Sequence, residues 1–161
     1  MVVIDASLIE INRPSHNQRN YYSGKHKRHG IKAQVLVDYF TKSILALAFS
    51  TGRIHDKELL RRSRFSIPEN VFVLMDLGYY GMHKHPRVIM PHKKPKKQEL
   101  TDSQKLDNRE ISSHRVYIEH VFAFLKSFKI LGSKYRNRRK RLAFRFSIIS
   151  SFYNKIYSDP L

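Results

Sequence analysis

Apolar positions in the first half of the chain fall into short runs that are typical of β-strands. The run "VVID" (residues 2–5) opens the chain, and the polar stretch at 12–29 predicts a loop. Two segments rich in β-branched and apolar residues, 30–38 and 43–50, are joined by a short connection. This spacing predicts an antiparallel hairpin.

The next elements alternate between helix and strand. "HDKELLRRS" (55–63) holds strong helix formers, and Asp56 is the expected N-cap. "VFVLMD" (71–76) is an apolar run ending in an acid, as a buried strand would be. "RVIMP" (87–91) predicts another short strand that stops at its proline.

The second half of the chain has the periodicity of helices. "TDSQ" (101–104) matches a capping box, and the pattern after it predicts a helix through Leu131 that ends at Gly132. A last helix is expected over 142–157. Together these elements predict one α/β domain over 1–161, with a mixed sheet covered by helices.

The charge of the chain indicates the class of partner that it binds. The 161 residues include 31 Lys and Arg against 13 Asp and Glu, a formal net charge of +18. Such a surplus favours a polyanion, above all nucleic acid, because cationic side chains release counterions from phosphates. The chain has no cysteine, no long uncharged apolar run and no N-terminal signal-peptide pattern, so we expect a cytoplasmic, nucleoid-associated protein.

Three basic clusters are candidates for binding the phosphate backbone. They comprise Lys25, Lys27 and Arg28, the segment "KKPKK" (93–97), and the group Lys134, Arg136, Arg138, Arg139, Lys140 and Arg141. The alternative for each cluster is a solvated loop that only keeps the protein soluble.

Two aspartates occupy matching positions after apolar runs. Asp5 follows "VVI" and Asp76 follows "VFVLM". If both runs are neighbouring parallel strands, the carboxylates meet at one edge of the sheet and repel each other, which a divalent cation such as Mg²⁺ or Mn²⁺ relieves. The alternative is that each Asp only caps a turn, as we expect for Asp38 in the hairpin.

Glu119 lies on the border of an apolar helix stripe. The stripe is formed by Ile118, Val121, Phe122, Leu125 and Phe128. With Ile118 at zero on a helical wheel, Arg115, Lys126 and Glu119 fall at about 60°, 80° and 100°. This column suits a metal-holding acid between two phosphate-binding cations, and an i,i+4 ion pair of Arg115 with Glu119 is the equal alternative.

Five blocks of the sequence resemble one family. The blocks are "VIDASLIEINRP", "YYSGKHKRHGIKAQVLVD", "TGRIHDKELL", "LMDLGYYG" and "RVYIEHVFAFLKSFKIL". In this order they resemble the catalytic domain of DDE-class bacterial insertion-sequence transposases, which belong to the RNase H-like superfamily. The resemblance implies a mixed five-stranded sheet flanked by helices. It also implies that Asp5, Asp76 and Glu119 bind two Mg²⁺ or Mn²⁺ ions, with Arg115 and Lys126 as the flanking cations.

The same resemblance implies a function and partners. The protein is expected to cut DNA at the ends of a transposable element and to join those ends to target DNA, as a homodimer on DNA. Relatives usually carry a DNA-binding region before the first acid, and we expect this sequence to lack one. An upstream reading frame joined by frameshifting, a truncated gene copy and an immobile element remnant are the open explanations. A nuclease that only hydrolyses DNA and an inactive remnant that only binds DNA are the alternatives.

Two tyrosines follow the second acid. Tyr79 and Tyr80 are candidates for stacking on an unpaired base near the cut. The alternative is that they pack at the start of a helix.

Overall fold

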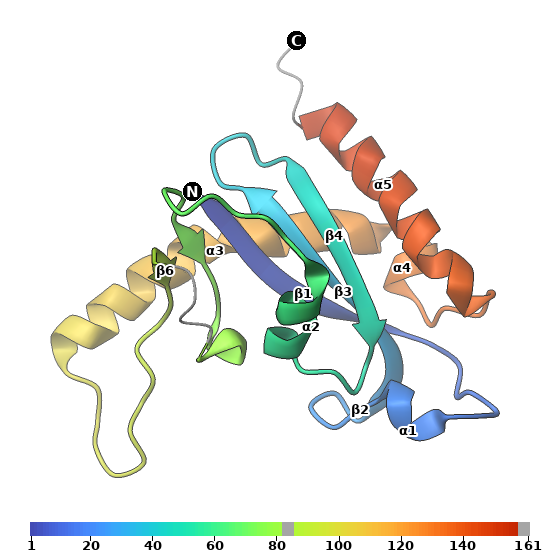
Figure 1. Cartoon of the computed structure of the whole chain (residues 1–161), viewed down its shortest axis with the longest axis horizontal. Coiled ribbons are helices and arrows are strands. Elements are labelled where there is room, and N and C mark those ends of the chain that lie inside the picture. The colour runs from blue at the N-terminus through green and yellow to red at the C-terminus, as the bar shows by residue number, and fades with distance from the viewer. Residues whose placement is uncertain (82–85, 158–161) are drawn as a thin grey trace.

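A computed structural model describes residues 1–81 and 86–157 (Figure 1). The centre of the protein is a β-hairpin to which a third strand is added. β1 (Val2–Glu10), β3 (Arg28–Asp38) and β4 (Ile44–Thr51) lie side by side, and both neighbouring pairs are antiparallel. The predicted hairpin at 30–38 and 43–50 is confirmed.

Parallel strands extend the sheet on the other side of β1. β5 (Val73–Leu74) pairs with β1 and β6 (Val88–Ile89) pairs with β5, both in parallel. β2 (Tyr22–Ser23) pairs with the first residues of β3. The sheet is therefore mixed and is flanked by helices, as expected for an RNase H-like fold.

Helices cover both faces of the sheet, and each face has its own apolar core. α2 (Asp56–Ser63) packs on one face together with the short 3₁₀ turn η1 (Leu77–Tyr79). The opposite face is covered by the long α3 (Asp102–Ser127), by α4 (Lys129–Gly132) and by α5 (Leu142–Tyr157). Two short turns complete the described elements, α1 (Gln18–Tyr21) and η2 (Arg139–Arg141).

The alternation of β1 decides where its acid points. Val2 and Ile4 belong to the core under α2, whereas Val3 belongs to the core under α3. Successive strand residues face opposite sides, so Asp5 lies on the α3 side. β1 continues to Glu10, which corrects the expectation that the strand ends at Asp5. The strand is longer because Ser7, Leu8 and Ile9 continue the ladder with β3.

Two other expected boundaries are wrong. His55 occupies the N-cap position of α2, and Asp56 is already helical, with its carboxylate paired to a lysine of the sheet instead of capping the helix. The helix expected to reach Leu131 ends at Ser127, where Phe128 becomes extended before the chain continues into α4. The spacing of apolar residues in the sequence does not reveal an interruption of a helix by a single residue.

The remaining helix signals are confirmed. Thr101 and Gln104 form both hydrogen bonds of the capping box at the start of α3. α5 covers the expected 142–157. Its Asn154 side chain accepts a hydrogen bond from the Ile44 N–H and donates one to the Ile44 carbonyl, at 2.8 and 2.9 Å, which fixes the helix to β4. Among the described helices, none has the length and apolar character needed to cross a bilayer.

Candidate active site

One arginine brings the two predicted aspartates together. The Arg115 Nη2 atom of α3 lies 3.5 Å from Asp5 Oδ2 and 4.0 Å from Asp76 Oδ2. The Asp5 and Arg115 side chains are each exposed by a fifth or less. Parallel pairing of β1 with β5 produces this meeting, since it places the two strands next to each other. The site is a partly buried pair of carboxylates with a cation beside both.

Burial dominates the electrostatics of Asp5. Desolvation raises the pKa of its carboxyl to about 6, partly opposed by the Ala6 N–H, which donates to Oδ1, and by the Arg115 guanidinium. The Asp76 and Asp56 carboxylates raise this pKa further. An ionised pair at this position is therefore unfavourable unless positive charge is brought to it.

The turn after β5 holds Asp76 in place. Its Oδ1 atom accepts a hydrogen bond of 2.5 Å from the Gly78 N–H, which caps η1. A Cβ atom on Gly78 would lie only 2.7 Å from Asp76 Oδ1 and 3.1 Å from Asp56 Oδ2. The glycine thus allows two carboxylates to approach the same point of the backbone.

A buried ion pair behind this turn was not predicted. Lys32 Nζ of β3 lies 2.7 Å from Asp56 Oδ1, and both side chains are largely buried. The same ammonium donates to the Ile54 carbonyl at 2.6 Å. Next to them, the Gln34 amide donates to the Tyr79 hydroxyl at 2.8 Å. The one feature of the sequence that points to these buried polar contacts is the presence of a lysine and a glutamine in an otherwise apolar strand.

Glu119 is not joined to the other acids. It lies one helical turn after Arg115 and its side chain is exposed. Within residues 1–81 and 86–157, no ion pair joins Arg115 to Glu119, and no group of three or more His, Asp or Glu side chains is arranged to hold a metal ion. The i,i+4 ion pair that was the alternative for Glu119 is therefore not formed.

The other cation of the column does approach the site. Lys126 is an exposed residue, yet desolvation of its ammonium lowers the pKa, while the Asp5 carboxylate acts in the opposite direction. Lys126 also lowers the pKa of His26, after the larger effects of burial and of Lys25 and Lys32. The turn between β2 and β3, which carries two of the predicted cations, therefore lies near Lys126 and Asp56.

Glu10 links this turn to the C-terminal basic cluster. Its carboxylate lies 3.2 Å from Arg28 Nη1 and 3.0 Å from Lys134 Nζ. The predicted cations of both clusters are exposed, namely Lys25, Lys27, Arg28, Lys134, Arg136, Arg138, Arg139, Lys140 and Arg141. We call Lys126, the 25–28 turn and the 134–141 segment the cationic track.

Only one of the two predicted stacking tyrosines is exposed. Tyr79 is fully buried and its hydroxyl is bonded to Gln34, so its ring has no open face for a base. The stacking prediction is wrong for Tyr79 because the residue fills the core under α2. Tyr80 is half-exposed, and the Lys93 ammonium lies 4.8 Å from its ring centroid.

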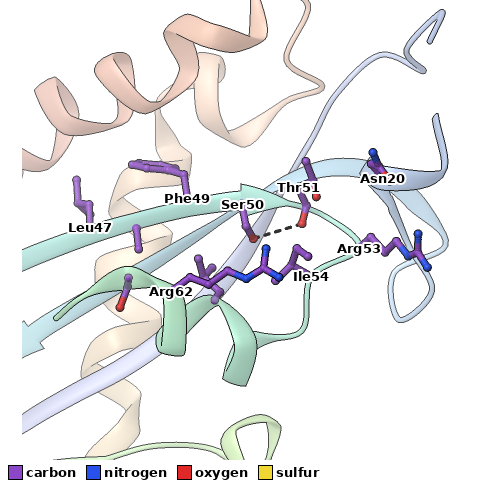
Figure 2. Close-up of a pocket in the computed structure, with 11 residues that line it drawn as sticks. Asn20, Leu47, Phe49, Ser50, Thr51, Arg53, Ile54 and Arg62 are labelled. Carbon is purple, nitrogen blue, oxygen red and sulfur yellow. Dashed lines mark hydrogen bonds between the residues drawn. The ribbon is translucent and has the colours of Figure 1, made fainter. Parts of the chain in front are cut away.

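A separate pocket of about 750 Å³ opens between β4 and α2 (Figure 2). Arg53 and Arg62 line it together with the polar Ser50, Thr51 and Asn20. None of the three predicted acids borders it. Its chemistry is therefore not that of the carboxylate pair.

Known proteins identify the family. The family described as "Transposase DDE domain" matches residues 1–152. A relative from Microchaete diplosiphon, named "Probable transposase for insertion sequence element IS702", is 39% identical over 155 residues. That alignment covers 96% of this chain but 56% of the relative, so the chain spans little more than half of the relative's length. No solved structure matches the chain. The chain belongs to the DDE transposase family of insertion sequences.

Proposed function

We propose that this domain cuts and joins DNA with the help of two divalent metal ions, Mg²⁺ or Mn²⁺. The convergence of Asp5 and Asp76 on Arg115 carries the proposal. Two partly buried carboxylates side by side are a poor choice for stability alone, and their position suits phosphoryl transfer.

The chemistry of the donor atoms suits such ions, and the Asp5 and Asp76 carboxylates already converge. Carboxylate oxygens are hard ligands that Mg²⁺ and Mn²⁺ prefer. Asp5, Asp76 and Glu119 are the residues that would hold them. When bound, the ions would supply an activated nucleophile and stabilise charge on the leaving oxygen.

The chain's own residues position the DNA. Arg115 supplies positive charge beside the two acids, and the Lys126 ammonium interacts electrostatically with the Asp5 carboxylate. The cationic track binds the sugar–phosphate backbone without reading its sequence. The half-exposed Tyr80 would stack on an unpaired base beside the cut.

The proposed partners are DNA and a second copy of the chain. The DNA would comprise the terminal repeats of the element and the target. A homodimer would hold two element ends together with the target DNA.

The test is a cleavage and joining assay on supercoiled DNA that carries the element ends. The variants are Asp5→Asn, Asp76→Asn and Glu119→Gln, and each is expected to lose metal-dependent nicking by at least 10²-fold while DNA binding is retained. Lys126→Ala is expected to weaken DNA positioning and to leave Mn²⁺ binding intact. Nicking that survives in all three acid variants contradicts the metal site.

A second candidate, a protein that binds DNA without cutting it, is favoured by the exposed and unassembled Glu119. Precut element ends separate the possibilities. Strand transfer gives products longer than the substrate, a hydrolysis-only nuclease gives only shorter ones, and a binder gives a shift in mobility without products.

A further inference from the structure

The outer side of α5 carries a row of large apolar side chains. Phe144, Ile148, Phe152 and Ile156 follow one another at intervals of four residues and are 67%, 52%, 50% and 46% exposed. The opposite side of the helix already fills the core. Figure 1 shows α5 at the edge of the molecule, next to β4. We call these four residues the α5 ridge.

The α5 ridge is unsuited to DNA. It contains no charged residue, although the chain as a whole carries +18. Arg145 is directed toward its own chain, where its Nη1 atom donates to the Tyr135 hydroxyl at 2.6 Å. Since DNA phosphates are held by cations, DNA is not the partner that this surface suits.

The size of the ridge fits the centre of a protein interface. With the adjoining Tyr157, which is 56% exposed, it offers roughly 500 Å² of apolar surface. This is at the upper end of what a monomer leaves open. A stable interface buries about 800 Å² on each partner, with an apolar centre and a polar rim.

A pocket lies beside the C-terminal end of the ridge. It has a volume of about 530 Å³ and its walls include Tyr117 and Phe124 of α3 and Tyr153 and Tyr157 of α5. Phe144 lies at the other end of the same helix. If the α5 helices of two copies pack antiparallel, Phe144 of one copy lies next to the C-terminal end of α5 in the other copy. The pocket of that other copy lies at this end.

We propose that a second copy of this chain docks on the α5 ridge, helix against antiparallel helix about a twofold axis. Ile148 of one copy then lies opposite Phe152 of the other, and Phe144 lies opposite Ile156. Such an isologous contact needs no surface beyond the ridge and its pocket. Ridges at four-residue spacing pack at an interhelical angle of about −50°. The inference specifies the surface for the proposed homodimer, and it does not depend on the metal chemistry.

The first test measures mass in solution without DNA or metal. Sedimentation velocity at micromolar concentration and moderate salt is expected to show a dimer. Ile148→Asp and Phe152→Asp are each expected to raise the dimer dissociation constant at least 100-fold. Leu106→Asp, at a 62% exposed apolar position of α3, is the matched control and is expected to remain dimeric.

The second test uses the absence of cysteine from the chain. A mixture of Ile148→Cys and Phe152→Cys proteins is expected to form a covalent dimer on oxidation, faster than either variant alone. Efficient crosslinking of Ile148→Cys with itself indicates a parallel pair and contradicts the proposed geometry.

Three outcomes would overturn the inference. The chain is monomeric at all concentrations, it forms a dimer that both Asp variants leave intact, or its ridge binds neutral lipid vesicles while the protein stays monomeric. Circular dichroism melting of each variant shows whether the fold is retained. These outcomes leave the cleavage assay unaffected, so the two proposals fail separately.

Discussion

Asp5 places an unfavourable charge inside the metal-free protein. Its pKa is raised to about 6, chiefly by burial, from the ordinary value of 3.8. Between these two pH values the folded chain binds more protons at this site than the unfolded chain does. The free energy of unfolding therefore decreases as pH rises through this range, and the Asp5 contribution is at its least favourable above pH 6.

Because the ionised Asp5 carboxylate lowers the free energy of unfolding above pH 6, we predict that Asp5→Asn stabilises the metal-free chain. In EDTA, the variant is expected to be more stable than the native chain at pH 7, by on the order of 2 kcal/mol, and this advantage shrinks as pH falls toward 4. Chemical unfolding across this range measures the effect. Asp107→Asn, at an exposed acid of α3, is the control. An advantage for Asp5→Asn that is the same at pH 4 and pH 7 would contradict the electrostatic explanation.

At the scale of elements, the first turn of α2 braces the turn that carries Asp76. Asp56 is tied to β3 through Lys32 and also lies against Gly78. An outer contact of this kind orients a ligand without touching the metal itself. We expect this contact to keep the Asp76 carboxylate directed toward the same point as the Asp5 carboxylate.

We therefore expect Asp56→Asn to weaken Mn²⁺ binding by about 10-fold. Isothermal titration measures the affinity. Hydrogen exchange at the Gly78 amide, which Asp76 accepts from, is expected to accelerate in the metal-free variant. Glu58→Gln is the matched control, because Glu58 pairs only with arginines on the outside of the same helix among the described ion pairs. Unchanged affinity in Asp56→Asn, with the fold intact, would assign the pair a purely structural role.

The elements also show what the sequence predicts and what it does not. The capping box and the run of apolar positions in α5 are local signals, and both helices begin where expected. The break at Phe128 depends on how α4 packs, and the pairing of Asp56 with Lys32 joins residues far apart in the chain. Contacts across the sheet have no local signature, so Asp56 was assigned only to a cap.

The same distinction applies to the candidate site. Adjacent strands were predictable from two apolar runs ending in acids, and their parallel pairing is confirmed. The helical wheel placed Arg115 near an acid but did not show that its partners are Asp5 and Asp76. Burial of Tyr79 was also not evident, since an aromatic residue after a strand suits a core as well as a surface.

Over the whole molecule, the cationic track predicts how DNA affinity depends on salt. Each phosphate contact adds about 0.9 to the slope of log affinity against log salt concentration. The double variant Arg136→Ala with Arg138→Ala is expected to lower this slope by about 1 to 2. Fluorescence anisotropy with duplexes of unrelated sequence, at several salt concentrations, measures it.

The control for this variant removes the same charge elsewhere. Lys105→Ala with Arg109→Ala lies in the first turns of α3, at the opposite side of the molecule from the 134–141 segment (Figure 1). The control is expected to retain the native slope. Equal loss in both double variants would mean that net charge, rather than the track, determines binding.

The two hydrogen bonds between Asn154 and Ile44 have a consequence for how readily the chain aggregates. Among the described strands β4 pairs only with β3, so its other edge is open to strand addition by a neighbouring molecule. The Asn154 amide occupies both backbone groups of Ile44 that such a strand would need. A chain truncated before Asn154 would lose this cover. Gene copies that end early should therefore yield aggregates rather than smaller folded domains.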